Sequence, residues 1–485
     1  MQAGLYIRFL MFLLFAGTVS SACNIPKQYN IVSILVDDWG WTDARCYGSD
    51  LYETLHIDQL AAEGVRFTNA YAACTVCSPT RAALMTGKYP ARLHVTDWIP
   101  GYKAPYAKLK KPDWTMYLSP DETILPEALK EKNYRSIHIG KWHLGHDEKY
   151  YPQNQGFDTN IAGYFKGQPP SYFYPYTRND GPPIPYLEGG KAGEYLTDRE
   201  AEEACRFIRE NRESPFYINL AHYAVHTPLQ AKEAYIEEYR EKIQEGMQHS
   251  NAVYAAMIRS VDESLGKIRK TLDEEGIADK TVILITGDNG GLTLYDITDN
   301  TPLRGGKGSA YEGGVRVPLI AYIPGITKAG SICKEAVLTI DIYPTFLELA
   351  GIRGHLPHSG DVDGLSLVPL AKDPEKQLNR QAVYWHFPHY HPGGATPYSA
   401  VRMGDYKLIE FFEDGRLELY NLKKDIGEKD ELSSSHPEKV QELFGHLKSW
   451  RDQVDAQIPA RNEAFNIKKV KPWLKNIYEN EKCYD

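Results

Sequence analysis

The chain has 485 residues, of which 42% are hydrophobic and 25% are charged, and its formal net charge is −9. This balance is typical of globular enzymes and excludes a collagen-like chain, an extended disordered chain and a protein with several membrane spans. An acidic chain without a long Lys/Arg block is also a poor candidate for nucleic-acid binding. The length allows a large hydrophobic core, in roughly three average domains or fewer larger ones.

The N-terminus has the features of an export signal. Arg8 precedes an apolar run from Phe9 to Ala16, and small residues follow as far as Ala22. The run is too short to span a bilayer. We therefore predict a signal peptide over residues 1–22. Cleavage after Ala22 leaves either a lipidated Cys23, as in bacterial lipoproteins, or an unmodified soluble product.

Short apolar runs alternate with amphipathic stretches through most of the chain. The runs predict buried strands at residues 31–36, 135–139, 216–220 and 281–286, with helices at 57–63, 123–132 and twice within 233–275. This alternation predicts an α/β domain whose central sheet is mostly parallel or mixed and is sandwiched by helices. We place this domain at residues 25–375.

A second unit is expected after a stretch rich in Pro, Gly, His and Asp at residues 354–380. Strands are predicted at 382–385, 406–409 and 416–420, and an amphipathic helix at 438–454. We therefore predict a smaller C-terminal α+β subdomain with an antiparallel sheet over residues 380–485.

Polar side chains follow each predicted strand of the first domain. They are Asp37 and Asp38, Lys141 and His143, His222 and His226, and Asp288 and Asn289. We expect them to form one site, because ligands bind beyond the carboxyl ends of strands in such sheets. Carboxylate and amide oxygens suit Ca²⁺ or Mg²⁺ better than zinc. Asp37 and Asp38 alone fit a strand-end turn equally well, but the pair at 288–289 favours a metal.

A cysteine opens the next predicted helix, in the stretch Cys77-Ser78-Pro79-Thr80-Arg81. Pro79 suits the first turn of a helix, which places Cys77 at the positive N-terminal end, where anions bind. Arg81 lies close enough to pair with an oxyanion. The alternative is a buried cysteine before a helix. Cys74 completes a C-x-x-C spacing, but no second metal-binding pair accompanies it.

Several motifs occur in a characteristic order: V-D-D-W-G at 36–40, C-x-P-x-R at 77–81, G-K-W-H-L-G at 140–145, H-T-P at 226–228 and G-D-N-G at 287–290. With these motifs the chain resembles the type I sulfatases of the alkaline-phosphatase superfamily over most of its length. The resemblance implies an alkaline-phosphatase-like fold and hydrolysis of sulfate esters.

The resemblance further implies that a formylglycine-generating (sulfatase-maturating) enzyme oxidises Cys77 to formylglycine. The aldehyde hydrates to a diol. One hydroxyl attacks sulfur, and the second then expels sulfate and restores the aldehyde. A thiol could not perform this last step, because it has no second hydroxyl. One Ca²⁺ is expected at Asp37, Asp38, Asp288 and Asn289, with the modified Cys77 completing its shell.

Roles for the cationic residues follow from the same resemblance. Lys141 contacts the sulfate, His143 deprotonates the diol, and His226 binds sulfate or donates to the bridging oxygen. Lys307 is the second sulfate-binding lysine, and either it or His226 protonates the leaving alcohol. Taken singly, each of these side chains is more often a solvated charge. We expect His222 to be structural.

Sugar contacts are expected from loops. Asp97 is expected to accept sugar hydroxyls and Trp98 to stack on a ring. The run Trp385-His386-Phe387-Pro388-His389-Tyr390-His391 in the C-terminal unit is expected to close over the pocket, with His386 as a sugar contact. A packed interdomain loop is the alternative for that run.

Together these features predict a carbohydrate sulfatase similar to bacterial exo-acting glycan sulfatases. We expect a terminal galactose or N-acetylgalactosamine sulfate, with the 4-O ester favoured over another sulfated glycan such as a 6-O-sulfated sugar. A phosphatase or phosphonate monoester hydrolase of the same superfamily and a non-catalytic glycan-binding relative are the alternatives.

The export signal predicts where such an enzyme works. We expect a periplasmic or outer-membrane-anchored protein of a Gram-negative bacterium, or a lysosomal or secreted protein if the source is eukaryotic.

Overall fold

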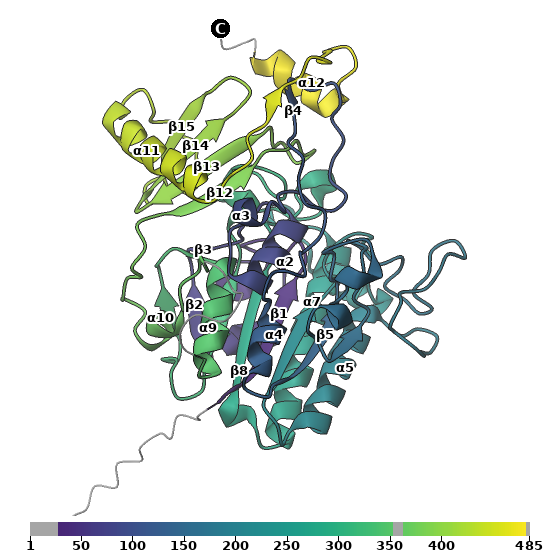
Figure 1. The fold of residues 1–485 in the computed structure, drawn as a ribbon. Coiled ribbons are helices and arrows are strands. Elements are labelled where there is room, and N and C mark those ends of the chain that lie inside the picture. Colours follow the sequence, from purple (N-terminus) through teal and green to yellow (C-terminus); the bar gives the residue numbers. More distant parts are fainter. Residues whose placement is uncertain (1–27, 353–361, 482–485) are drawn as a thin grey trace, which may run out of the picture.

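The computed structural model describes residues 28–352 and 362–481. The predicted signal peptide and Cys23 lie outside the described residues. Figure 1 shows a central sheet covered by helices on both sides, with a smaller antiparallel sheet beside one end of it. Among the described residues, no helix is long and apolar enough to cross a membrane.

The central sheet is mixed and has eight strands. In spatial order they are β10 (Ser331–Cys333), β2 (Val65–Phe67), β9 (Leu319–Tyr322), β8 (Thr281–Gly287), β1 (Asn30–Val36), β7 (Phe216–Ala221), β5 (Arg135–Gly140) and β6 (Thr159–Ile161). Strand β1 lies at the centre and pairs in parallel with β7 and β8, whereas β9 is antiparallel to β8 and β2. The prediction of a mixed α/β sheet is confirmed.

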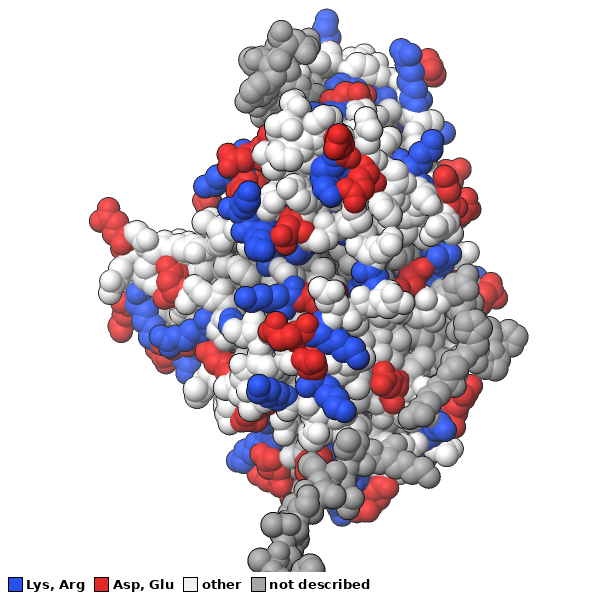
Figure 2. Space-filling model, turned by 90° about the vertical axis from the view of Figure 1, so that its left-hand side faces the viewer, with Lys and Arg blue, Asp and Glu red and all other residues white. Residues whose placement is uncertain are grey.

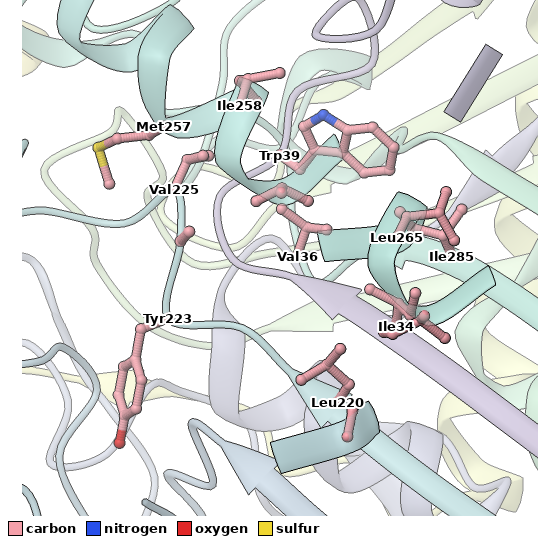
Figure 3. Close-up of a cluster of buried hydrophobic side chains, with 14 of the residues drawn as sticks. Ile34, Val36, Trp39, Leu220, Tyr223, Val225, Met257, Ile258, Leu265 and Ile285 are labelled. Carbon is pink, nitrogen blue, oxygen red and sulfur yellow. The ribbon is translucent and has the colours of Figure 1, made fainter. Parts of the chain in front are cut away.

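The two faces of β1 belong to two separate cores. Val32, Ile34 and Val36 pack on one side and Ile31 and Leu35 on the other, as the two-residue period of a strand requires. Figure 3 shows the first of these cores. Its helices are α1 (Leu55–Glu63), α5 (Leu196–Asn211), α6 (Glu233–Lys242) and α7 (Ala252–Glu274). The second core contains α2 (Cys77–Thr86), α4 (Leu125–Lys130), α9 (Ile342–Leu349) and α10 (Val368–Lys372).

The C-terminal region forms a four-stranded antiparallel sheet, as predicted. Its strands are β12 (Val383–Phe387), β13 (Tyr398–Met403), β14 (Tyr406–Phe411) and β15 (Leu417–Asn421), and the helix α11 (Pro437–Gln453) packs on β13 and β14. The shorter elements are α3 (Pro90–Leu93), α8 (Glu312–Val315), α12 (Pro472–Glu481), β3 (Ala70–Tyr71), β4 (Leu109–Lys110), β11 (Val337–Leu338) and β16 (Ala460–Arg461). Short 3₁₀ turns lie at Arg45–Tyr47, Glu148–Tyr150, Pro152–Asn154, Ala278–Lys280, Leu294–Asp296 and Thr339–Asp341.

A single apolar core joins this sheet to the segment that precedes and forms α2. The indole N–H of Trp385, on β12, donates to the Ala72 carbonyl at 2.9 Å. Tyr384 stacks on Trp450 of α11 with their ring centroids 4.8 Å apart, and Trp450 also contacts Tyr89. The C-terminal sheet therefore supports the cysteine helix directly.

A buried ionic cluster lies at the same junction. Lys407 on β14 is fully buried and lies 3.1 Å from Glu312 of α8 and 3.0 Å from Glu428. Arg316 and the Tyr71 hydroxyl also contact the Glu312 carboxylate, at 3.2 and 2.7 Å. Because Glu312 closes the loop that carries Lys307, this cluster ties the loop to the C-terminal sheet.

We expect Lys407→Ala to lower the free energy of unfolding by about 3–5 kcal/mol, because it leaves buried carboxylates without their cation. Urea unfolding followed by tryptophan fluorescence measures the change. The control is Lys423→Ala, which removes an ion pair of a 76% exposed lysine and is expected to cost less than about 1 kcal/mol. Equal losses in the two variants would contradict the assignment.

Candidate functional site

The predicted catalytic and metal-binding residues lie together at the carboxyl edge of the central sheet. They come from the ends of β1 (Asp37, Asp38), β5 (Lys141, His143), β7 (His226) and β8 (Asp288, Asn289), from α2 (Cys77, Arg81) and from the loop before α8 (Lys307). This edge is where parallel strands deliver ligand-binding residues.

Positive φ angles at two positions bend the chain at the ends of β1 and β5, so that the residues that follow face the site. Asp38 has a left-handed φ of 57°, which Asp tolerates better than most residues. Gly140 has a φ of 95°, and a Cβ there would lie 2.1 Å from the Ala221 carbonyl oxygen. Position 140 therefore requires glycine, and the turn it allows aims Lys141 at the end of β1.

The carboxylates are held by cations and amides from other segments. Lys141 Nζ donates to Asp37 Oδ2 at 2.6 Å, and Lys307 Nζ donates to Asp38 Oδ1 at the same distance. Arg81 forks onto Asp288 Oδ2 through Nε and Nη2, at 3.0 and 2.8 Å. Such charge-assisted contacts fix the side chains rigidly.

Three buried oxygens in this cluster have no hydrogen-bond partner among the described residues: Asp37 Oδ1, Asp38 Oδ2 and Asn289 Oδ1. Asp37, Asp38 and His226 also offer ligand atoms that lie within 4.8 Å of one another. Buried polar atoms are almost always paired, so these unpaired oxygens point to a ligand. Oxygen ligands of this kind fit a hard divalent cation.

The pKa values of the carboxyl groups in the cluster are shifted by burial and by neighbouring charges. Burial and then the Asp288 carboxylate raise the pKa of Asp37 well above its usual range. Burial also favours the protonated form of Asp38, but Lys307 and His226 outweigh it and hold the pKa of Asp38 below the usual range.

Cys77 begins α2 and is 3% exposed. Its Sγ lies 3.4 Å from His143 Nδ1, while His143 Nε2 lies 2.5 Å from the Ile99 carbonyl oxygen. Because a carbonyl only accepts, the proton of a neutral His143 sits on Nε2 and the Nδ1 lone pair faces position 77. Burial and then Lys141 hold the pKa of His143 well below its usual range.

His226 lies beside the carboxylates with its own tautomer fixed. Its Nδ1 donates to the Thr227 carbonyl at 2.9 Å, so Nε2 carries the lone pair and lies 3.7 Å from Asp38 Oδ2. Burial and then Lys307 lower the pKa of His226 to about 3. Burial would also lower the pKa of Lys307, but Asp38 reverses this effect and raises it.

A cavity of about 740 Å³ opens over these groups. Cys77, His143, His226 and Lys307 lie at its base, and Trp98, Ile99, Pro100, Met116, Phe165 and Leu292 form apolar walls. His146, Lys166, Gln168 and His391 add polar groups. Apolar walls with a few fixed polar groups are typical of small-molecule sites.

Two predicted sugar contacts need correction. Asp97 and His386 are buried and do not line the cavity. The Asp97 carboxylate accepts the backbone N–H groups of Trp98 and Tyr102, at 2.9 and 3.2 Å, and burial raises its pKa to about 8. His386 lies between Ser399 Oγ and the Gln457 carbonyl. Both therefore support loops.

His391 lies on the cavity wall instead of His386. Its Nδ1 accepts the Gly393 backbone N–H at 3.0 Å, which leaves the proton of the neutral ring on Nε2. Gly308, next to Lys307, permits the close approach, because a Cβ there would lie 1.7 Å from His391 Nδ1. The histidine of this run that lines the cavity is thus His391, which the turn at 391–395 places there.

Other residues near the site have supporting contacts. His222 is held between Glu200, at 2.6 Å, and Ser264, at 2.9 Å, as expected for a structural histidine. Arg304 donates to the Tyr420 hydroxyl and the Glu428 carbonyl, which links the Lys307 loop to the C-terminal sheet.

A profile of the sulfatase family matches residues 29–352, more than half of the chain. The chain belongs to the sulfatase family. A second profile, for the C-terminal region of N-sulphoglucosamine sulphohydrolase, matches residues 306–456 of this sulfatase. The chain is therefore a hydrolase of sulfate esters, and the resemblance noted from its motifs is confirmed.

Relatives and solved structures agree with this assignment. A sulfatase of Formosa agariphila is 30% identical, covering 92% of each chain. Human N-acetylgalactosamine-6-sulfatase is 34% identical over 72% of this sulfatase and 66% of its own length. The crystal structure of Ps i-CgsB has a TM-score of 0.74 and 29% identity, covering 90% of this sulfatase and 95% of that chain.

We expect His391→Ala to lower kcat/KM for sulfate release about 10- to 100-fold, because one hydrogen bond from Nε2–H to the substrate is lost. The matched control is His446→Ala on α11, which is expected to leave kcat/KM within about twofold, since a surface change away from the site has little effect. Steady-state kinetics on one sulfate ester measure both, and equal values in the two variants would remove His391 from the site.

Proposed function

We propose that this chain is a formylglycine-dependent sulfatase that removes a sulfate ester from a galactose-type sugar at the end of a glycan. The observation that carries the proposal is the position of Cys77. It lies at the base of the cavity with His143 on one side and with His226 and Lys307 beside it.

A calcium ion is the metal we assign to the unpaired oxygens. Asp37, Asp38, Asp288 and Asn289 would hold it, through hard oxygen ligands of the kind that Ca²⁺ prefers. When bound, the ion supplies positive charge to the sulfate oxygens and to the nucleophile. The three oxygens without hydrogen-bond partners among the described residues support this fit.

Position 77 supplies the nucleophile. Its hydrated aldehyde offers one hydroxyl for attack on sulfur and a second whose proton must leave when sulfate is released. His143 Nδ1 faces that position without a proton, and its low pKa keeps it neutral, so it can accept this proton as a base.

Lys141, His226 and Lys307 handle the charge and the leaving group. Lys141 and Lys307 are buried ammonium groups that can stabilise sulfate oxygens as the S–O bond breaks. A sulfate bound beside His226 adds negative charge, which raises the pKa of that imidazole and favours a proton on Nε2. His226 can then donate this proton to the leaving sugar oxygen, with Lys307 as the alternative donor.

The sugar and its sulfated carbon follow from weaker observations. The human, rat and mouse relatives are N-acetylgalactosamine-6-sulfatases, which favours a galactose-type ring. Their names favour the 6-O ester, whereas the sequence favoured the 4-O ester, and we take the 6-O ester as the leading candidate. Ps i-CgsB was solved with k-i-k-neocarrahexaose, which supports a glycan substrate.

Two further expectations accompany the proposal. A maturation enzyme must act on Cys77 before folding buries it, and the N-terminal segment is expected to direct the chain to the periplasm or, through Cys23, to the outer membrane. A phosphonate monoester hydrolase of Agrobacterium radiobacter shares the fold, with a TM-score of 0.63 at 21% identity, so a phosphate ester belongs in every substrate test.

We expect Cys77→Ala to abolish sulfate release, because alanine supplies neither hydroxyl. The test is sulfate release from galactose and N-acetylgalactosamine esters sulfated at the 4-O or 6-O position, with matching phosphate esters. Peptide mass must first confirm formylglycine at position 77, and circular dichroism must confirm that the variant folds. Full activity of the variant, or faster phosphate release, would overturn the proposal.

Removal of the metal is expected to affect stability as well as activity. Chelation should lower the thermal unfolding temperature, because buried carboxylates lose their counter-ion, and Ca²⁺ should restore it. Asn289→Leu and Asp38→Asn should abolish the stabilisation by Ca²⁺, as measured by scanning calorimetry. Recovery with Zn²⁺ and not with Ca²⁺ would contradict the assignment.

A further inference from the structure

A second hollow lies next to the catalytic cavity. Its volume is about 420 Å³, and Met116 lines both spaces. Met116 is 48% exposed and forms part of the wall of each space. The hollow therefore adjoins the cavity that holds Cys77, with Met116 between them.

The lining of this hollow is basic and aromatic. Its cations are Lys103, Lys110 and Lys111, its aromatic rings are Tyr102, Trp114 and Tyr390, and Asp113 is the one acid among its described lining residues. We name these residues the basic groove. Lys111 Nζ lies 5.7 Å from the centre of the Trp114 ring, so a cation and an aromatic face are presented side by side.

The basic groove carries more positive than negative charge, because three lysines and one acid, Asp113, line it. Lys103, Lys110 and Lys111 form no ion pair within the part of the chain that the structure describes. By contrast, Figure 2 shows basic and acidic side chains interspersed over the face it draws. A surplus of ammonium groups around one hollow attracts an anion.

The walls of the basic groove are held in place by the C-terminal segment. Strand β4, which ends in Lys110, pairs with β16, and Trp473 Nε1 of α12 donates to the Tyr102 hydroxyl at 3.0 Å. The Tyr390 hydroxyl accepts the Leu109 N–H at 2.9 Å and donates to Glu413 at 2.6 Å. A preformed groove binds a ligand with less ordering cost.

We propose that the basic groove is a subsite for an anionic sugar, the residue that follows the sulfated sugar in the glycan. The inference rests on the proposed sulfatase function. The lysines would pair with a sulfate or carboxylate group, while Trp114 would pack against the apolar face of the ring. The physiological substrate is then an oligosaccharide that carries at least two anionic groups.

The test compares oligosaccharides that share the same sulfated terminal sugar and differ only in its neighbour. The neighbour is sulfated, a uronic acid or neutral. We expect kcat/KM to be about tenfold or more higher with an anionic neighbour, mainly through a lower KM, and the advantage to shrink in high salt. The larger of the two anionic effects identifies sulfate or carboxylate as the preferred group.

Variants assign the effect to the groove. Lys103→Ala combined with Lys110→Ala is expected to reduce the anionic-to-neutral ratio at least about threefold, since exposed charge pairs are individually weak. The control is Lys270→Ala on α7, a 77% exposed lysine, which should leave the ratio unchanged. An equal ratio in the wild type and in the double variant would overturn the subsite.

Binding separates this proposal from the sulfatase proposal. The Cys77→Ala protein should bind the anionic oligosaccharide more tightly than the neutral one in calorimetry, whether or not the wild type turns it over. Tighter binding without any sulfate release from confirmed formylglycine enzyme would support the groove and overturn the sulfatase function. Sulfate release together with equal binding of the anionic and neutral oligosaccharides would support the sulfatase function and overturn the subsite.

Discussion

Three buried carboxylates at one edge of the central sheet are each held by a cation from a different part of the chain. Asp37 is paired with Lys141, Asp38 with Lys307, and Asp288 with Arg81. Separating one of these pairs would leave an uncompensated buried charge at a cost of about 3–5 kcal/mol, so moving any one of these segments alone is unfavourable. The strand ends, the cysteine helix and the loop before α8 are thereby fixed relative to one another, and the cavity is shaped around them.

The C-terminal sheet extends this constraint. It packs on the segment before α2 and, through Lys407 and Glu312, holds the loop that carries Lys307. It also supplies His391, whose neighbour Ala395 donates its N–H to the Gly308 carbonyl at 2.9 Å. Most residues at the base of the cavity thus come from the central-sheet region, while the C-terminal sheet holds the loop of Lys307 and supplies His391 to the cavity wall.

The fold and the strand-end residues of the site could be predicted because both depend on local patterns, whereas Lys307 was assigned to the site by the resemblance to the sulfatases. Buried strands are continuous apolar runs, and the residues directly after them must meet at one edge. The cavity wall could not be predicted in the same way. Asp97 is polar and follows the cysteine helix, but its oxygens satisfy backbone N–H groups of its own turn. His386 and His391 are five positions apart in one run and are both buried, but His386 lies in β12 whereas the turn after it places His391 at the cavity wall.

Burial also controls which groups at the site carry a proton. His143 and His226 lose their affinity for protons because the interior disfavours charge and because ammonium groups lie close by. Lys307 keeps its proton because Asp38 compensates for burial. An anionic ester entering the cavity raises the pKa of His226 from its low value, whereas Lys307 already carries its proton, so the added charge can change the protonation state of His226 but not that of Lys307. Under the proposed mechanism, substrate binding therefore prepares His226 as the proton donor, and burial keeps both histidines neutral until the sulfate arrives.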